Sequence, residues 1–316
     1  VGLTVSASVR TTDGSTVSDV LAISSLDNPA DLPSIEELKK KVKDFADNLM
    51  ELKETPMIEE YYTGPVLFEG GAASRLFTDN LLSPGRLLAL RTMAPARGML
   101  DEQLGRRIID SRLTVKNYTT LAEYNGTPLF GCYEIDGDGV VPAAELTLVE
   151  NGVFKRMLNG RVPTLKAPES TGSARFMISP DNPMAIVSPG TIHVQASKGV
   201  GPEKLKKALL KAAKEADLEY AYIVRRIGGE ASAVYKVNVK DGKEIRVRVN
   251  NLSAPELTKL MDLKGISSDE RVMNYFPNGV PASLIYPSAI IVGDVEINRT
   301  TPKIEEEPVL KHPLQR

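Results

Sequence analysis

Few side chains in this 316-residue chain could bind zinc or act as a base near neutral pH, because it holds only two histidines, His193 and His312, and one cysteine, Cys132. A hydrolytic zinc ion normally takes three protein ligands from His, Cys and carboxylates. His193 lies between apolar Ile192 and Val194 in the stretch TIHVQAS, so strand alternation places its side chain on the opposite face from theirs. We interpret His193 as a structural or half-exposed strand residue and predict no histidine-based metal site.

The acidic stretch EIDGDGVVPAAEL invites comparison with a calcium loop, since Asp136, Asp138 and Gly139 are close together. An EF-hand loop that started at Asp136 would need Gly at its sixth position and an acid at its twelfth, but these positions hold Val141 and Thr147. We therefore predict a glycine-rich turn between strands.

Other catalytic patterns find little support. The sequence has no G-x-S-x-G nucleophile elbow, and its GDG and TGS stretches are not phosphate-binding loops. Cys132 has no neighbouring base in the sequence, so we expect it to be buried and inert. The pairs Arg106–Arg107 and Arg225–Arg226 are interpreted as solvated, although a strand could turn one guanidinium of the second pair toward a groove.

The composition is that of a globular protein. Apolar residues make up 42% of the chain, enough for a sizeable core, and the 25% of charged residues balance to a net charge of −2. We therefore expect no nucleic-acid partner. No run of about 18 apolar residues occurs, so we also expect no membrane span. A single cysteine excludes an intramolecular disulfide.

Residues 1–60 predict an N-terminal strand or hairpin, turned at TDGS, and a long amphipathic helix that leads into the main domain. The start signal of the helix is Pro33–Ser34. Its apolar residues recur every three or four positions: Ile35, Leu38, Val42, Phe45, Leu49 and Leu52. A single apolar stripe of this length most often packs on the protein's own sheet.

Residues 61–300 predict a β-rich domain of the α+β class, with a large, mostly antiparallel sheet and a few flanking helices. Helices are expected over 72–82, 202–216 and 254–263. The dipeptides Asn151–Gly152 and Asp241–Gly242 predict hairpin turns, and a strand is expected over 131–135. Residues 167–190 are expected to form a long loop, and residues 301–316 an extended arm.

The order and spacing of five stretches resemble the C-terminal domain of the TldD/PmbA family, whose members are described as zinc-dependent peptidases and as modulators of DNA gyrase. The stretches are TTDGSTVSDV, YTGPVLFEGGAASRLF, GTPLFGCYEIDGDGVVPAAELTLVENGVFKRML, STGSAR and VPASLIYPSAIIVGDVEIN. They are spread from Thr12 to Thr300, so the resemblance covers nearly the whole chain. It implies that the separate N-terminal domain of the family would precede Val1.

The resemblance implies a zinc site that this sequence does not reproduce. TldD-like subunits carry His-Glu-x-x-x-His on the helix after the GPV-L-E element, and the corresponding residues here are Phe77, Thr78 and Leu82. A phenyl ring and an isobutyl group cannot bind zinc, and a hydroxyl cannot serve as the general base. The segment 271–279, expected to supply a cysteine ligand, contains none. We therefore expect no cofactor, and the chain is most similar to the metal-less PmbA (TldE) branch.

Members of that branch pair with a TldD-like subunit. The resemblance thus implies a non-catalytic subunit that dimerises, with itself or with an HExxxH-bearing partner, and binds an unfolded or extended peptide by strand addition. It places the lining of the peptide cavity at Gly131, Tyr133, Ile135, Thr171, Gly172, Ser173 and Arg175.

Two other hypotheses stay open. One is a metallopeptidase active by itself, whose metal is held by a part of the protein before Val1 or by carboxylates, although carboxylate-only sites favour magnesium or calcium. The carboxylates in question are Asp79, Glu102, Asp136 and Asp138. The other is a structural or assembly protein that keeps only the fold. The family resemblance favours a cytoplasmic location, while the absence of an initial Met leaves export open.

Overall fold

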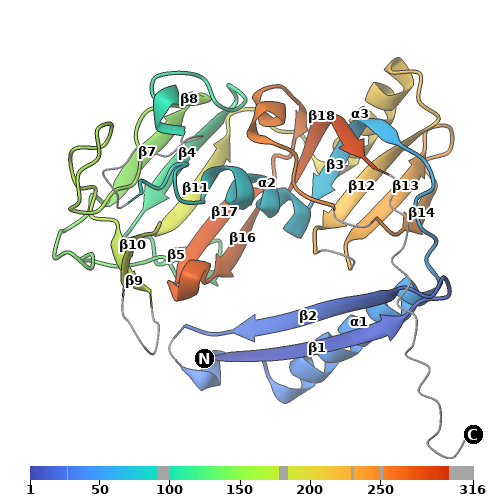
Figure 1. Ribbon diagram of the computed structural model, residues 1–316, viewed down its shortest axis with the longest axis horizontal. Helices are drawn as coiled ribbons and strands as arrows, with labels where there is room; N and C mark the ends of the chain where they lie inside the picture. Colours follow the sequence, from blue (N-terminus) through green and yellow to red (C-terminus); the bar gives the residue numbers. More distant parts are fainter. Residues whose placement is uncertain (27, 91–99, 178–183, 229–230, 250–251, 299–316) are drawn as a thin grey trace, which may run out of the picture.

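Two six-stranded sheets lie side by side with the helix α2 (Gly71–Leu81) between them, and a hairpin with a long helix forms a separate layer (Figure 1). The structure is a computed structural model and describes residues 1–26, 28–90, 100–177, 184–228, 231–249 and 252–298. The expected α+β class with mostly antiparallel pairing is confirmed, but the strands form two large sheets rather than one.

The first sheet has the strand order β16-β17-β11-β4-β7-β8. Its strands are β4 (Leu113–Tyr118), β7 (Glu145–Glu150), β8 (Val153–Phe154), β11 (Thr191–Ala196), β16 (Glu270–Tyr275) and β17 (Ala282–Pro287). Neighbours are antiparallel except β11 and β17. Ile192 and Val194 belong to the main core, so the alternation along β11 leaves His193 on the opposite face, as expected.

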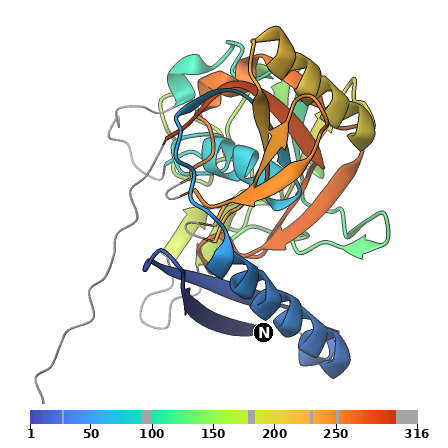
Figure 2. The ribbon, with the colours of Figure 1, turned by 90° about the vertical axis from the view of Figure 1, so that its right-hand side faces the viewer.

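The second sheet has the order β14-β13-β12-β3-β18-β15, and only β12 and β3 pair in parallel. Its strands are β3 (Tyr62–Glu69), β12 (Tyr220–Arg226), β13 (Ala233–Asn238), β14 (Glu244–Val247), β15 (Leu263–Ile266) and β18 (Ala289–Ile297). Val66 and Phe68 pack on the α2 side, whereas Leu67 packs on α3 (Pro202–Glu215), which covers the outer face (Figure 2). The sheet is therefore buried on both faces.

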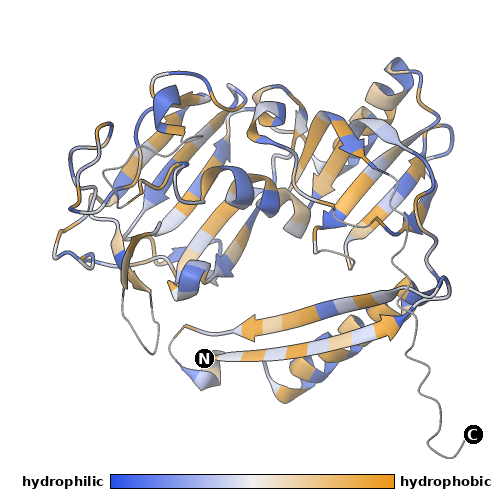
Figure 3. Cartoon of the chain, viewed as in Figure 1, coloured by the Kyte–Doolittle hydropathy of each residue, from blue (hydrophilic) through white to orange (hydrophobic). Residues whose placement is uncertain are grey.

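The N-terminal layer consists of β1 (Gly2–Arg10), β2 (Thr16–Ser24) and α1 (Ile35–Glu54). The strands are antiparallel; hydrophobic and weakly polar residues alternate along β1, whereas β2 has a continuous hydrophobic stretch in its second half (Figure 3). Ser34 and Glu37 form a reciprocal capping box at the start of α1. Phe45 and Leu49 of the helix are buried against Val17 of β2. The predicted hairpin and helix are thus confirmed.

Buried arginine contacts attach this layer to the second sheet. Arg248, which is 3% exposed, pairs with Asp13 and donates to Ser15 Oγ and the Thr55 carbonyl, each at 2.9 Å. Burial opposes ionisation of Asp13, but hydrogen bonds from Thr11 and Ser15 and the Arg248 charge outweigh it and hold the pKa of Asp13 well below its usual range. The attachment therefore depends on an ionised carboxylate.

Arg225 is exposed and Arg226 is half-buried, but both are engaged in ion pairs rather than simply solvated. Arg225 contacts Glu69 at 3.0 Å and Glu244 at 2.8 Å, whereas Arg226 contacts Asp19 of the N-terminal layer at 2.5 Å. The register of β12 shifts between Val224 and Arg226, at a β-bulge or irregularity.

Two predictions in the middle of the chain are wrong, one of a strand and one of a loop. Residues 131–135 form no strand: the Gly131 amide donates to Ser283 Oγ at 3.3 Å and the Tyr133 amide to the Thr119 carbonyl at 2.8 Å, so they join no strand ladder. Gly131 packs against the Gly190 backbone, since a Cβ at this position would lie 2.3 Å from the Gly190 carbonyl carbon. The predicted loop over 167–190 contains a hairpin of β9 (Ala174–Met177) and β10 (Met184–Val187).

The helix predicted over 254–263 is also wrong, since only a short 3₁₀ helix covers Leu257–Met261. The carbonyl of Leu260 accepts a hydrogen bond from the Asp110 amide at 2.8 Å, which ties this segment to a loop. The remaining short elements are 3₁₀ helices at Pro29–Asp31, Leu100–Gln103 and Pro277–Gly279 and the strands β5 (Glu123–Tyr124) and β6 (Thr127–Pro128).

No helix within the described ranges is long and apolar enough to cross a membrane. The predicted arm over 301–316, with His312, lies outside the described residues.

Candidate functional site

Two positions of the degenerate metal motif, Phe77 and Thr78, lie within α2, and the third, Leu82, directly follows the helix. Phe77 is 1% exposed and belongs to the main core, and Leu82, the C-cap of the helix, is 8% exposed. Thr78 is half-buried, and its hydroxyl donates to Asp79 Oδ1 at 3.2 Å. Hydrocarbon side chains and a neutral hydroxyl do not fit a zinc ion.

Carboxylates do not form an alternative metal site within the described part of the chain, where no group of three or more His, Cys, Asp or Glu is placed to hold a metal ion. Asp79 is paired with Arg75 at 3.0 Å, and Asp138 Oδ2 accepts from the Arg161 amide at 2.8 Å. Asp136 is 5% exposed and Glu102 lies on the surface. The carboxylates named for an active metallopeptidase therefore do not converge.

An apolar pocket of about 200 Å³ lies where the lost motif meets two other segments. Leu82 lines it from the end of α2, Pro277 and Asn278 line it from the segment expected to supply a cysteine, and the stretch 184–188 closes it from β10. Ser188 also lines the pocket; it is 2% exposed, and its Oγ has no hydrogen-bond partner among the described residues. Three segments far apart in sequence thus share one apolar pocket.

The residues predicted to line a peptide cavity come together in part. The Tyr133 hydroxyl donates to the Gly172 carbonyl at 2.9 Å, and the Arg175 guanidinium carbon lies 4.1 Å from the centroid of the Tyr133 ring. Burial lowers the pKa of Arg175 and raises the pKa of Tyr133. Oγ1 of Thr171 and Oγ of Ser173 lie 2.9 Å apart.

The other two predicted cavity residues are placed differently. Ile135 is 60% exposed, and Gly131 contacts the backbone of Gly190. Cys132 between them is exposed, so the prediction of a buried thiol is wrong. A role of these residues in peptide binding stays a prediction.

Asp136 organises the glycine-rich turn that the sequence predicted. Its Oδ1 accepts from the amides of Asp138 and Val140 at 2.9 and 2.8 Å, and its Oδ2 accepts from the Ala174 amide at 3.0 Å. Because three N–H groups occupy the carboxylate, it stabilises the turn and the start of β9 rather than offering oxygens to a cation.

A second polar cluster, missed in the sequence, surrounds His193. Its Nε2 lies 2.9 Å from Glu270 Oε1, and Tyr124 donates to the other oxygen of Glu270. Burial opposes ionisation of Glu270, but the hydrogen bonds from His193 and Tyr124 outweigh it and lower its pKa. The hydrogen bond to Glu270 raises the pKa of Tyr124 to about 12. This cluster links β5, β11 and β16. His193 and Glu270 are 77 residues apart in the sequence, which explains why no local pattern indicated the cluster.

Comparison with known proteins identifies related domains. A family model described as the PmbA/TldA metallopeptidase C-terminal domain matches residues 61–298. A search of curated protein sequences found no match.

Solved structures share the fold at low sequence identity. The TldE protein of Thermococcus kodakarensis is 15% identical, with 94% of this chain and 62% of that chain covered and a TM-score of 0.55. A Thermotoga maritima protein named as a candidate modulator of a DNA gyrase is 16% identical, with the same coverages and a TM-score of 0.55. A Bacteroides thetaiotaomicron protein named in the same way is 15% identical, with 92% and 60% covered and a TM-score of 0.51. The chain thus spans less than two thirds of the length of these proteins.

Proposed function

Because the chain belongs to the PmbA/TldD metallopeptidase family, we propose that it is a non-catalytic, peptide-binding subunit of that family. One observation carries the proposal: the pocket lined by Leu82, the last position of the family motif, and by Pro277 and Asn278 of the segment expected to supply a cysteine is apolar. Apolar walls with a few polar groups are typical of binding sites rather than of hydrolytic metal centres.

The pocket suits one apolar side chain of a bound peptide. Its volume of about 200 Å³ is small, and its walls are mainly aliphatic, from residues such as Leu82, Leu88 and Ile186. Ser188 Oγ is a buried hydroxyl without a partner in the described chain, so it is free to bind a polar group of the ligand. We expect an extended peptide whose apolar residue enters this pocket.

The proposed subunit acts as a dimer, either with a second copy or with a TldD-like partner that carries His-Glu-x-x-x-His. The likeness in fold to a TldE protein supports the second arrangement. In that arrangement this chain would help hold a peptide while the partner carries out hydrolysis. Light scattering of the chain alone and after mixing with such a partner measures the mass of each assembly.

Metal content and proteolysis test the non-catalytic part. The chain is incubated with zinc, passed through a desalting column and counted for zinc, calcium and magnesium by plasma mass spectrometry. We expect clearly less than one ion of each metal per chain and no hydrolysis of casein. Casein hydrolysis by the purified chain, abolished by a chelator, would overturn the proposal.

Peptide binding tests the pocket. The chain contains no tryptophan, so the fluorescence of a single tryptophan in a synthetic peptide reports binding without background from the protein. Ala185→Phe fills the pocket from β10 and should weaken binding about tenfold or more, since burial of one apolar side chain is excluded. Ala22→Phe adds the same ring at an exposed position of β2 and should leave binding unchanged. Equal affinities of the two variants would rule out this pocket as the binding site.

A further inference from the structure

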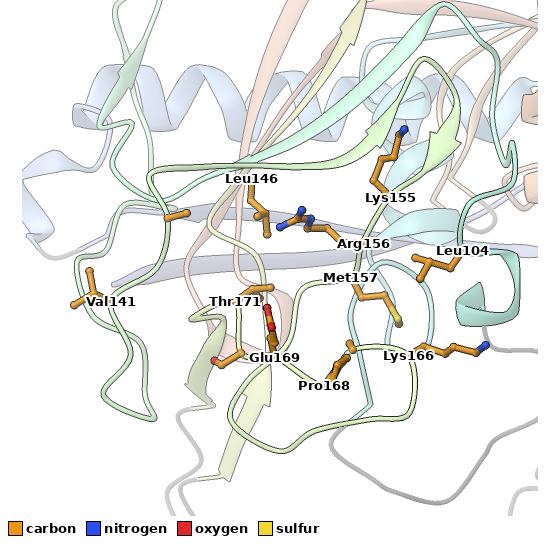
Figure 4. A pocket seen from close by; sticks show the side chains of 13 residues that line it. Leu104, Val141, Leu146, Lys155, Arg156, Met157, Lys166, Pro168, Glu169 and Thr171 are labelled. Carbon is orange, nitrogen blue, oxygen red and sulfur yellow. The ribbon is translucent and has the colours of Figure 1, made fainter.

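A second, larger pocket of about 400 Å³ lies beside the first sheet (Figure 4). Its apolar part includes Leu104, Leu146 and Met157, which come from three separate segments, together with Val141, Ala143, Ala167 and Pro168. Three cationic side chains, Lys155, Arg156 and Lys166, line it as well, and Glu169 is its single acidic residue. This combination of apolar walls and excess positive charge suits an anionic group attached to apolar side chains.

The wall over 166–171 is held in place by one buried residue, Asn159, which is 0% exposed. Its Nδ2 donates to the Ala167 carbonyl at 2.7 Å, its amide donates to Thr171 Oγ1 at 2.7 Å, and its carbonyl accepts from the Thr171 amide at 3.1 Å. The Ala167 amide also donates to Thr164 Oγ1 at 3.0 Å. A wall fixed in this way need not be ordered by the ligand, which favours binding.

Two of the three cations have no acidic partner within the described part of the chain, and one of them, Arg156, points along the pocket. Lys155 is paired with Glu150 at 3.1 Å and extends away from the centre of the pocket in Figure 4. Arg156 and Lys166 form no ion pair or side-chain hydrogen bond with any described residue. In Figure 4 the Arg156 side chain extends toward Leu146, whereas the Lys166 side chain extends away from it. A guanidinium beside an apolar wall binds a carboxylate in two-pronged geometry.

The pocket borders a stretch of β7 whose outer edge pairs with no strand among the residues that the structure describes. On its outer side β7 pairs with β8 only at Val149 and Glu150, and the Leu148 carbonyl accepts from the amides that follow β8. The stretch 145–147 pairs with β4 on its inner side and has no outer strand within the described residues. An extended chain can add to such an edge through main-chain hydrogen bonds.

We infer that this pocket binds an extended peptide with an acidic residue between apolar ones, the carboxylate contacting Arg156, with Lys166 adding to the positive charge of the site, and the apolar side chains packing on Leu104, Leu146 and Met157. The inference rests on the proposed function only in taking a peptide as the ligand. It assigns an acidic preference to a site separate from the pocket at Leu82.

The test compares two synthetic peptides that each contain one tryptophan. In the first, the Glu peptide, Leu alternates with Glu; in the second, the Gln peptide, Leu alternates with Gln. The wild-type chain should bind the Glu peptide about tenfold more tightly, since hydrogen bonds to charged groups are the stronger ones. The preference should shrink as salt is added. It should disappear in the double variant Arg156→Gln, Lys166→Gln and persist in the control Arg106→Gln, an exposed arginine outside the pocket.

The failures of the two proposals are distinguishable. Binding of neither peptide to the wild-type chain would overturn peptide binding as a whole, together with this inference. Equal binding of both peptides, or an acidic preference that persists in the double variant, would overturn this inference alone. Unchanged thermal unfolding of the variants shows that any loss of binding is not a loss of folding.

Discussion

Replacing Phe77 by alanine tests whether the first position of the lost metal motif has become part of the core. Phe77 is 1% exposed, and its helix contacts β3 and β12 of one sheet and β17 of the other. Because a sheet bounds the position on either side, the neighbours cannot easily collapse into the vacated space. Truncation should therefore cost toward the upper end of the range for Phe→Ala, about 4–5 kcal/mol of unfolding free energy.

The matched control is Phe176→Ala on β9, where the side chain is 55% exposed. The same truncation at this surface position should cost less than about 1 kcal/mol. Each kcal/mol shifts the thermal midpoint by about 2–4 °C in a domain of 150–250 residues, so Phe77→Ala should lower it by about 8–20 °C and the control by less than about 4 °C. Urea unfolding gives an independent comparison of the midpoints. A shift for Phe77→Ala no larger than that of the control would refute the argument that packing has replaced the metal site.

Three further predictions concern acid stability, a turn and the single thiol. Burial opposes ionisation of Asp110, but hydrogen bonds from Arg112 and the Leu263 amide outweigh it and lower its pKa to about 2. A carboxyl with a folded pKa below its unfolded value stabilises the protein above the unfolded pKa and loses this contribution as pH falls through the folded one. Asp110→Asn should therefore lower the urea midpoint at neutral pH. Between about pH 4 and pH 2 the variant should lose less unfolding free energy than the wild type. Parallel plots of stability against pH for the two proteins would contradict this. Gly152→Ala and Gly126→Ala both place a methyl at positive φ, 79° and 78°, but only at Gly152 would the new Cβ lie 2.5 Å from a backbone oxygen, that of Ile109. Gly126→Ala should lower the unfolding free energy by about 1 kcal/mol, and Gly152→Ala should lower it by more. Equal thermal midpoints of the two variants would count against the steric argument. Cys132 is exposed, so Ellman's reagent should label one thiol in the folded chain; labelling only after unfolding would disprove its exposure.

Local signals predicted the elements that local energetics control. The capping box of Ser34 and Glu37 and the regular apolar stripe place α1, and Pro202 opens α3 at its first turn. Asn151 and Gly152 adopt φ values of 48° and 79°, the left-handed region that the Asn-Gly pair favours in a hairpin. Each of these features depends on residues only a few positions apart.

Predictions failed where distant residues decided the outcome. The segment 131–135 has a sequence suited to a strand, but the Gly131 amide donates to Ser283 Oγ, 152 residues away along the chain. The segment 254–263 has a helical pattern, yet the Leu260 carbonyl binds the Asp110 amide. The exposure of Cys132 likewise follows from the course of a segment that is irregular rather than a strand.

By itself the sequence determined that Phe77, Thr78 and Leu82 cannot hold a zinc ion, because ligand chemistry is a property of the side chain alone. It also determined the α+β class through its hydrophobic periods. Only the tertiary structure decided that the strands form two sheets around α2, and that Leu82, Ser188 and Asn278 line one pocket. These juxtapositions depend on pairing and packing between segments remote along the chain, for which no local pattern carries the information.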